Sequence, residues 1–197
     1  MSEASSGIAA ITEILRQELL KLRPDGDIGL EGLVGHCLGT LLDRQFRLAR
    51  AGRQHGRDGA TTPGAFDVFF EAKLYSERPP SAEDLRSKLL SAIDAHQPKL
   101  DVWIPAATVA LGENSVAEVI KTGERFGVTV VVVDWTSHPL PPLAVLLAGT
   151  RTATTDWLTT TSSGVDLSAI DEALKSISAH PSFAPLLGEL KDSLSPR

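Results

Sequence analysis

The spacing of apolar residues predicts that the chain begins with two helices. Apolar side chains recur every three or four positions from Ile8 to Leu22 and again from Leu30 to Leu42, which is the period of a helix with one buried face. Between these segments, Arg23 to Asp27 contains a proline and a glycine that interrupt the pattern. The first two elements are therefore expected to be separate helices joined by a turn.

After the second helix, the pattern changes to the alternation that is typical of strands. A first strand is predicted within Gln45 to Ala51, a second includes Asp58, and a third surrounds Glu71. A Pro-Gly step between the last two predicts a turn. A hairpin whose loop is Gly64 and Ala65 would place Asp58 directly opposite Glu71, where side chains lie close together across the strand pair.

Helices then alternate with buried strands. A helix is predicted to begin at a capping box formed by Ser81 and Asp84 and to extend to about His96. The apolar runs Leu100 to Thr108 and Val128 to Trp135 are predicted to be strands, with a helix from Asn114 to Phe126 between them. A strand, a helix and a strand in this order imply a right-handed parallel crossover.

The C-terminal part is predicted to be accessory to this core. A short apolar helix spans Leu143 to Ala148, and the Thr- and Ser-rich segment Gly149 to Gly164 is predicted to be a linker or an extended arm. Two short helices, Leu167 to Ser178 and Ala184 to Leu194, follow. We therefore divide the chain into an appended helix (1–27), a core (28–150) and a tail of linker and helices (151–197).

Composition limits what the chain can be. Its 197 residues, of which 42% are hydrophobic, suffice for one α/β core with helical additions. The single cysteine, Cys37, excludes an intramolecular disulfide, and no apolar run has the length of a membrane span. The N-terminus has no basic segment followed by an apolar core, so no signal peptide is expected. We expect a cytoplasmic protein with no membrane partner.

A cluster of arginines contrasts with the net charge of −6. An acidic chain is not a typical general nucleic-acid binder, for which a strongly basic domain is usual. The cluster is flanked by two aspartates and consists of Arg44, Arg47, Arg50, Arg53 and Arg57. Its last three members, Arg50, Arg53 and Arg57, are predicted to bind the phosphate backbone of a nucleic acid. The alternative is a solvated charged face.

The residues that follow this cluster have the composition of a phosphodiester-cleaving site. Glu71 and Lys73 are two positions apart on the predicted strand and share a face, and Asp58 would lie opposite Glu71. Two carboxylates can hold one hard divalent cation, which neutralises charge that develops on a phosphate. An adjacent ammonium can orient or help deprotonate the attacking water. The pattern predicts a metal-dependent phosphodiester hydrolase.

Asp58, Glu71 and Lys73 resemble the motif of the PD-(D/E)XK nuclease superfamily, although Arg57 replaces the proline that gives the family its name. The segment Leu30 to Leu42 resembles the helix that precedes the catalytic sheet in this family, and Glu31 matches the glutamate that this helix often contributes. The resemblance implies a restriction endonuclease-like α/β fold with an αβββαβαβ core and a mixed central sheet.

The same resemblance implies a role for each site residue. Asp58, Glu71 and the Ala72 carbonyl would bind Mg²⁺, for which Mn²⁺ can substitute. Lys73 would act on the water or the phosphate. Glu31 would supply a second or water-mediated metal contact, and Gln54 would be a nearby polar support.

Three segments resemble, more narrowly, nuclease effector domains that are fused to STAND-type NTPases in bacterial antiphage defence. They are Gln54 to Gly59, Glu71 to Tyr75 and Val130 to Trp135. This resemblance implies a magnesium-dependent endonuclease that acts as a defence effector on double-stranded DNA. It also implies fusion to, or association with, a STAND NTPase and a homo-oligomer as the active form.

Two other functions stay open. A catalytically inactive nuclease-like fold could serve as a nucleic-acid binding or oligomerisation module, although the intact set of two acids and a lysine favours activity. A Rossmann-like module could instead bind a small ligand at the strand ends near Thr108 and Asp134. Nucleotide hydrolysis is not expected, because the run that ends at Asp134 resembles a Walker B element in a chain without a phosphate loop. His36 and Cys37 are predicted to pack in the core. Asp67 is predicted to be structural or to support the site from outside the metal ligands, rather than to bind metal.

Overall fold

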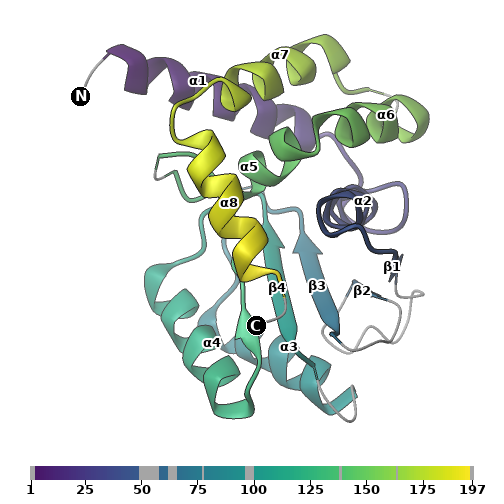
Figure 1. Cartoon of the computed structure of the whole chain (residues 1–197), viewed down its shortest axis with the longest axis vertical. Helices are drawn as coiled ribbons and strands as arrows, with labels where there is room; N and C mark the ends of the chain where they lie inside the picture. Colours follow the sequence, from purple (N-terminus) through teal and green to yellow (C-terminus); the bar gives the residue numbers. More distant parts are fainter. Residues whose placement is uncertain are drawn as a thin grey trace.

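A mixed sheet forms the centre of the molecule (Figure 1). The computed structural model describes residues 3–48, 58–61, 66–76, 78–95, 100–137, 139–162 and 164–195. Within these residues the strands lie in the order β1-β2-β3-β4-β5. They are β1 Phe46–Leu48, β2 Gly59–Thr61, β3 Val68–Lys73, β4 Val102–Ala107 and β5 Thr129–Val130. The first three strands are antiparallel, whereas β3, β4 and β5 are parallel to one another.

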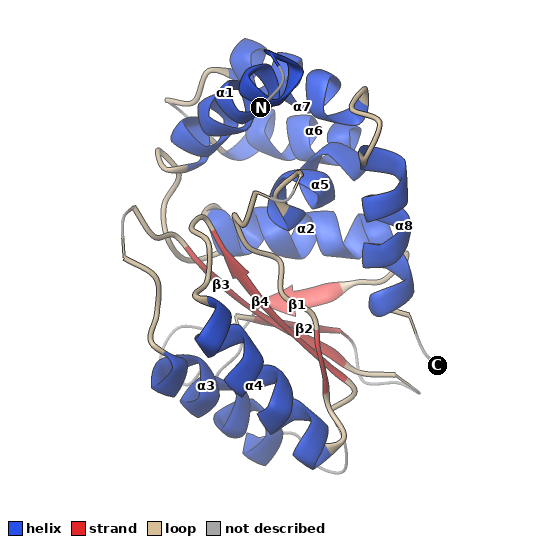
Figure 2. Ribbon diagram, turned by 90° about the vertical axis from the view of Figure 1, so that its left-hand side faces the viewer, coloured by secondary structure: helices blue, strands red, loops and turns tan. Residues whose placement is uncertain are grey.

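Helices cover both faces of the sheet (Figure 2). On one face lie α3 Ala82–Ala95 and α4 Glu113–Phe126, and on the other lie α2 Leu30–Leu42 and α5 Pro142–Gly149. Successive residues of β3 alternate between these layers, because side chains alternate along a strand. Phe70 packs with the α2 and α5 layer, whereas Phe69 packs with the α3 and α4 layer. Glu71 and Lys73 are therefore both on the α3 side of β3, and the prediction that they share a face is confirmed.

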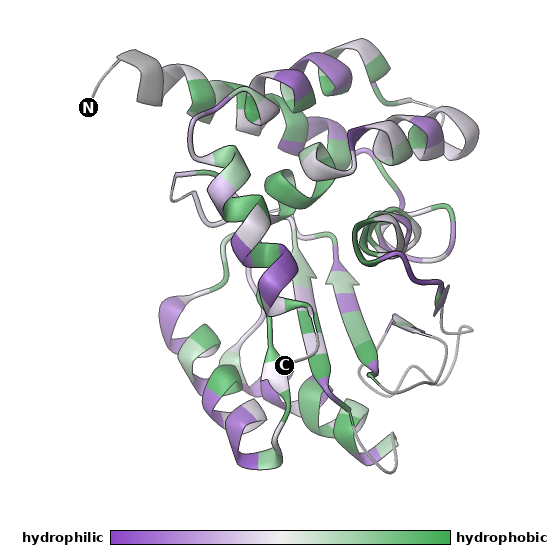
Figure 3. Cartoon of the chain, viewed as in Figure 1, coloured by the Kyte–Doolittle hydropathy of each residue, from purple (hydrophilic) through white to green (hydrophobic). Residues whose placement is uncertain are grey.

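The helix α5 is hydrophobic all round and forms the middle of the larger core (Figure 3). All sides of α5 can be apolar because it is surrounded by other helices, namely α2, α6, α7 and α8. These outer helices are α1 Glu3–Leu19, α6 Arg151–Thr161, α7 Leu167–Ser178 and α8 Phe183–Ser193. None of the described helices is both long and apolar enough to cross a membrane.

The predicted linker at 149–164 is wrong, because most of it is the helix α6. Threonine is a poor helix former, which is why the sequence suggested an arm. In α6, however, threonine hydroxyls donate to carbonyls one turn earlier, as Thr155 does to Arg151 at 3.1 Å. Trp157 and Leu158 are buried in the core beside it. Tertiary packing thus outweighs the weak propensity of the segment.

The predicted αβββαβαβ order is confirmed by the sequence of elements from α2 to β5. The helix α2 has the predicted bounds, and the hairpin pairs Gly59 with Phe70 and Ala60 with Phe69, the register predicted from the loop position. The capping box of α3 is also confirmed, since the Asp84 N–H donates to Ser81 Oγ at 3.1 Å. The last strand is shorter than predicted: β5 ends at Val130, although the N–H groups of Val131 and Val133 still donate to β4 carbonyls and an isolated bridge joins Ala106 to Val133.

Substitution of Gly59 by alanine should destabilise both the hairpin and the adjoining site. A Cβ at this position would lie 2.2 Å from the ring of Phe70, which is fully buried. Overpacking of this kind costs about 1–3 kcal/mol. Thermal unfolding checks the prediction, with Gly188→Ala as the control, because Gly188 lies in α8 with nothing within 4 Å of an added Cβ. Equal melting temperatures for the two variants would contradict the packing at Gly59.

Candidate active site

Asp58 is fixed at the edge of β3, immediately before β2. Its N–H donates to the Phe70 carbonyl at 2.7 Å, although Phe70 is already paired with Gly59, so the hairpin register shifts by one residue at Asp58. Its side-chain Oδ2 accepts a hydrogen bond from the Ala72 N–H, also at 2.7 Å. The residue is 1% exposed. Asp58 therefore lies beside β3, but it is not paired directly with Glu71 as the predicted register required: its backbone bonds Phe70 and its side chain bonds Ala72.

Glu31 reaches the same place from the first turn of α2. The loop before α2 turns at Gly26, whose φ of +82° lies in the left-handed region that favours glycine. This turn directs the Gly26 N–H to Glu31 Oε2 at 2.8 Å. The other oxygen, Oε1, is 3.3 Å from Lys73 Nζ. The backbone thus holds one oxygen of Glu31 and leaves the other to face the site.

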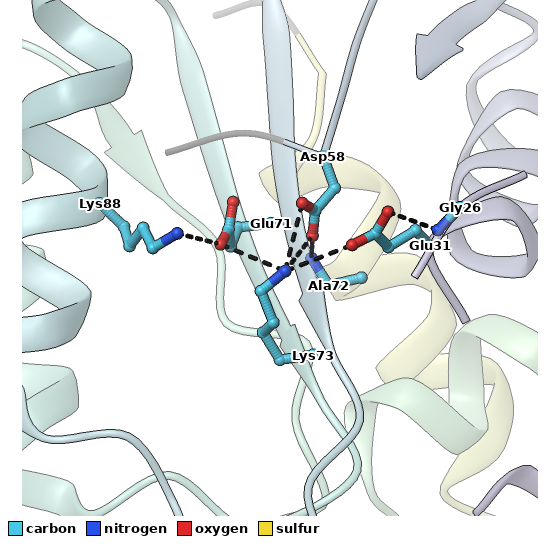
Figure 4. Close-up of polar contacts among 7 residues, drawn as sticks. All are labelled: Gly26, Glu31, Asp58, Glu71, Ala72, Lys73 and Lys88. Atoms are coloured by element: carbon cyan, nitrogen blue, oxygen red, sulfur yellow. Dashed lines mark hydrogen bonds and ion pairs between the residues drawn. The ribbon is translucent and has the colours of Figure 1, made fainter. Parts of the chain in front are cut away.

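The Lys73 ammonium lies among three carboxylates, which come from α2, from the residue before β2 and from β3 (Figure 4). Its Nζ is 3.1 Å from Asp58 Oδ2, 3.3 Å from Glu31 Oε1 and 3.5 Å from Glu71 Oε1. Asp58 and Glu71 thus meet at one ammonium group, which Glu31 reaches from α2 on the other face of the sheet. The predicted acids and lysine are brought together.

Of the three acids, Glu71 has the fewest hydrogen bonds to its carboxylate oxygens among the described residues. It is 4% exposed, and within the described part of the chain neither carboxylate oxygen accepts a hydrogen bond that meets the usual geometry. Its Oε1 has two ion-pair contacts, with Lys73 at 3.5 Å and with Lys88 of α3 at 3.0 Å. A buried carboxylate oxygen without hydrogen bonds is costly. Such an oxygen is suited to binding a cation.

Burial and charge shift the proton affinities in the site. Burial, together with the negative charges of Glu71 and Glu31, raises the pKa of Asp58 to about 7, against the opposing effect of Lys73. Burial alone would lower the pKa of Lys73, but the charges of Glu71, Asp58 and Glu31 outweigh it and raise that pKa. Lys73 therefore stays protonated at neutral pH, whereas Asp58 is close to its midpoint.

The donor atoms fit a hard divalent cation, provided that the lysine moves. Three carboxylates are the oxygen ligands that Mg²⁺ prefers. Among the residues that the structure describes, no group of three or more His, Cys, Asp or Glu side chains can hold a metal ion as it stands. In Figure 4 the Lys73 ammonium lies between the acids. The lysine occupies the centre that a metal ion would take.

The backbone of Ala72 adds a further oxygen at this edge. Its N–H points to Asp58. In an antiparallel ladder the N–H and the C=O of one residue face the same neighbour. The Ala72 carbonyl therefore faces the side of β3 on which Asp58 lies, which is consistent with its expected role as a ligand.

Part of the predicted site lies outside the described residues. This holds for Gln54 and for the three arginines Arg50, Arg53 and Arg57, whose roles stay predictions. Conversely, sequence reasoning missed Lys88. No sequence signal distinguishes it from other helix lysines, because its contact with Glu71 depends on how α3 packs against the sheet.

At the strand ends where a small-ligand site was considered, the side chains of Thr108 and Asp134 hydrogen-bond neighbouring loops of the protein. Thr108 Oγ1 accepts from the Tyr75 N–H and donates to the Tyr75 carbonyl, which joins the loops that follow β3 and β4. The Asp134 carboxylate accepts hydrogen bonds from the N–H groups of Leu111 and Thr136 and from the Thr136 hydroxyl. Both side chains are thereby engaged, which argues against a ligand site built on them.

Two neighbouring residues of α2 differ from each other. Cys37 is buried as predicted, with Sγ 3.3 Å from Thr154 Oγ1. The prediction that His36 packs in the core is wrong, because its side chain is exposed. Adjacent positions on a helix point about 100° apart, so the face that buries Cys37 turns His36 to solvent.

Asp67, just before β3, is buried, and its backbone N–H donates to Asp101 Oδ2 at 2.9 Å.

Comparisons with known proteins give a solved structural neighbour. No family model and no curated protein matches the chain. The MspJI restriction endonuclease, solved in complex with a 27-mer oligonucleotide, is similar with a TM-score of 0.42 and 14% sequence identity. The match covers 95% of this chain and 40% of that chain, so the present chain spans less than half of its neighbour. In its own element order and mixed sheet, the chain has the restriction endonuclease-like α/β fold predicted from its sequence.

Proposed function

We propose that the protein is a metal-dependent endonuclease that hydrolyses phosphodiester bonds. The observation that carries this proposal is the convergence of Asp58, Glu71 and Glu31, from three separate parts of the chain, on the single ammonium of Lys73. A fold that needs only a stable core has no reason to bury three carboxylates together, because each is costly to remove from water. Clustered, shifted titratable groups are typical of functional sites.

The residues divide the chemistry among them. Asp58, Glu71 and the Ala72 carbonyl would hold Mg²⁺ or Mn²⁺, with Glu31 as a second or water-mediated contact. The bound cation would supply charge neutralisation at the phosphate and a more acidic water. Lys73 orients that water and offsets charge on the phosphate. For this, its ammonium has to leave the centre of the acids, which its partly exposed side chain permits.

The substrate and cellular setting follow from the narrower resemblance of the sequence. It supports double-stranded DNA as the substrate and a role as an effector in antiphage defence, in the cytoplasm. It also supports association with, or fusion to, a STAND NTPase and activity as a homo-oligomer.

Incubation with plasmid DNA and with RNA, with Mg²⁺, Mn²⁺ or a chelator, tests the proposed function. We expect nicked and linear DNA only when a divalent metal is present. A forced oligomer is the necessary control, because an effector can be silent as a monomer. If the forced oligomer also fails to cleave but binds DNA, the second candidate, an inactive nucleic-acid binding module, replaces the first.

Replacement of Arg50, Arg53 and Arg57 together with alanine should weaken binding to all DNA sequences similarly. These residues are proposed to bind the phosphate backbone. If each contacts one phosphate, their loss should reduce the slope of log K against log salt concentration by about three. Binding curves at several salt concentrations measure this slope. An unchanged slope in a folded variant would place the nucleic acid elsewhere.

A further inference from the structure

A second lysine, Lys88, meets the proposed metal site from the helix α3. Its Nζ lies 3.0 Å from Glu71 Oε1, whereas Lys73 Nζ lies 3.5 Å from the same oxygen (Figure 4). Its side chain is 44% exposed, whereas that of Glu71 is 5% exposed. The buried acid thus has one lysine on its own strand and another on the helix that covers the strand.

The sequence of α3 holds Lys88 at this place. The capping box fixes the start of the helix, where the Ser81 hydroxyl and the Asp84 carboxylate bond each other at 2.7 Å. Leu85 and Leu89 are buried against the sheet. Lys88 lies on the flank between these buried positions and is one turn after Asp84, since residues four apart share a helix face. The Asp84 carboxylate is hydrogen-bonded to Ser81, and the ion pair of Lys88 is with Glu71.

A small cavity opens between α3 and the ends of β3 and β4. Its volume is about 60 Å³. Glu71, Lys73 and Lys88 line it together with Tyr75 and Asp84, and the rest of its wall is largely apolar. Two ammonium groups therefore border one cavity beside the acids that would hold the metal. An apolar wall strengthens the attraction of such cations for an anion.

A count of formal charges shows what the completed site lacks. Three carboxylates and two ammonium groups leave one negative charge when all three acids are ionised. A divalent cation turns this into one positive charge. Once that cation takes over Glu71, Lys88 has lost its anionic contact and faces another cation. One phosphodiester group, with its single negative charge, balances the charge of these three acids, the two ammonium groups and the cation; the Asp84 carboxylate, which also lines the cavity and is hydrogen-bonded to Ser81, is outside this count.

We propose that Lys88 is a second phosphate-binding residue, which contacts the phosphate at the site of cleavage after the metal ion has taken over Glu71. The inference rests on the proposed nuclease function and assigns the substrate contact to a residue outside the acid, acid and lysine motif. Before metal binds, Lys88 holds Glu71 in place. In the loaded complex, its ammonium donates to a non-bridging phosphate oxygen from the α3 side of the cavity.

The variants Lys88→Gln and Lys88→Arg test this role, with Lys191→Gln as the charge-matched control on an exposed position of α8. For Lys88→Gln we expect KM for DNA at saturating metal to rise roughly ten-fold, since a hydrogen bond between an ammonium and a charged phosphate oxygen is lost. The salt dependence of DNA binding should fall by about one unit of slope, and Lys88→Arg should restore most of both. Affinity for Mn²⁺ alone should be unchanged or higher, because a competing cation has been removed.

The other possible results contradict either the role of Lys88 or the proposed nuclease function. If Lys88→Gln binds Mn²⁺ more weakly and keeps a normal KM at saturating metal, Lys88 only positions Glu71, and the inference is wrong. If Lys88→Gln behaves as Lys191→Gln does while the wild type cleaves DNA, the inference also fails and the proposed function stands. A wild type that cleaves nothing in any metal, even as a forced oligomer, overturns the proposed function and this inference with it.

Discussion

Replacement of Lys73 by alanine is expected to lower the rate of phosphodiester hydrolysis by about 10²–10⁴-fold, the usual contribution of a positioned proton-transfer or charge-stabilising group. Affinity for the metal ion should not fall, and we expect it to rise. The physical reason is that the Lys73 ammonium lies 3.1–3.5 Å from all three acids, so it competes with a cation for the same oxygens. DNA binding in the presence of metal should be largely retained.

The same substitution should destabilise the metal-free protein, because it leaves buried carboxylates without their common cation. Added Mn²⁺ should recover the melting temperature, since the ion replaces the lost charge. Single-turnover cleavage and calorimetric titration with Mn²⁺ measure the two effects, and Lys191→Ala controls for loss of a surface charge. Unchanged cleavage by a folded Lys73→Ala protein would remove Lys73 from the mechanism.

Replacement of Asp58 by asparagine is expected to abolish hydrolysis and, in a chelator, to stabilise the folded protein at alkaline pH. Burial, with the charges of Glu71 and Glu31, raises the pKa of Asp58 to about 7 from 3.8. The folded state therefore favours the protonated acid. The stability that this contributes is fully present below pH 3.8 and is lost as the pH rises through about 7. An uncharged asparagine does not undergo this loss.

The difference in melting temperature between Asp58→Asn and the wild type should therefore grow between pH 5 and pH 8, by at least about 3 °C for a protein of this size. Scanning calorimetry in a chelator measures it, and the exposed Asp192→Asn serves as the control. With Mn²⁺ present the order should reverse at pH 8, since only the wild type keeps the ionised ligand. A difference that does not change with pH would show that Asp58 ionises in the folded protein as it does in water.

The hairpin is the part of the site that sequence reasoning could predict. The alternation around Glu71 defines which residues share a face, and the Pro-Gly turn fixes the register. Together they predict that Asp58 lies opposite Glu71. The pairing of Gly59 with Phe70 has that register. Both signals are local, because neither depends on how distant elements pack.

The remaining features depend on packing between distant elements. Lys88 and Glu71 are 17 positions apart in the sequence, and their contact requires α3 to lie over β3. The orientation of Glu31 depends on the Gly26 turn, whose N–H fixes one carboxylate oxygen. The helix α6 forms because Trp157 and Leu158 reach the core, although its threonines favour other structures. Local propensity cannot supply these contacts.

Anomalous diffraction at the manganese edge, from crystals of the protein grown with Mn²⁺, tests the central claim most directly. We predict one strong peak between the Asp58 and Glu71 carboxylates, with oxygen-to-metal distances of roughly 2.0–2.2 Å, close to those for magnesium. The Lys73 ammonium should have moved away from the centre of the three acids. If the crystals show no peak there at saturating Mn²⁺, and Lys73 still bridges Asp58, Glu31 and Glu71, then these residues form a structural ion-pair network and the account of a metal-dependent nuclease is wrong.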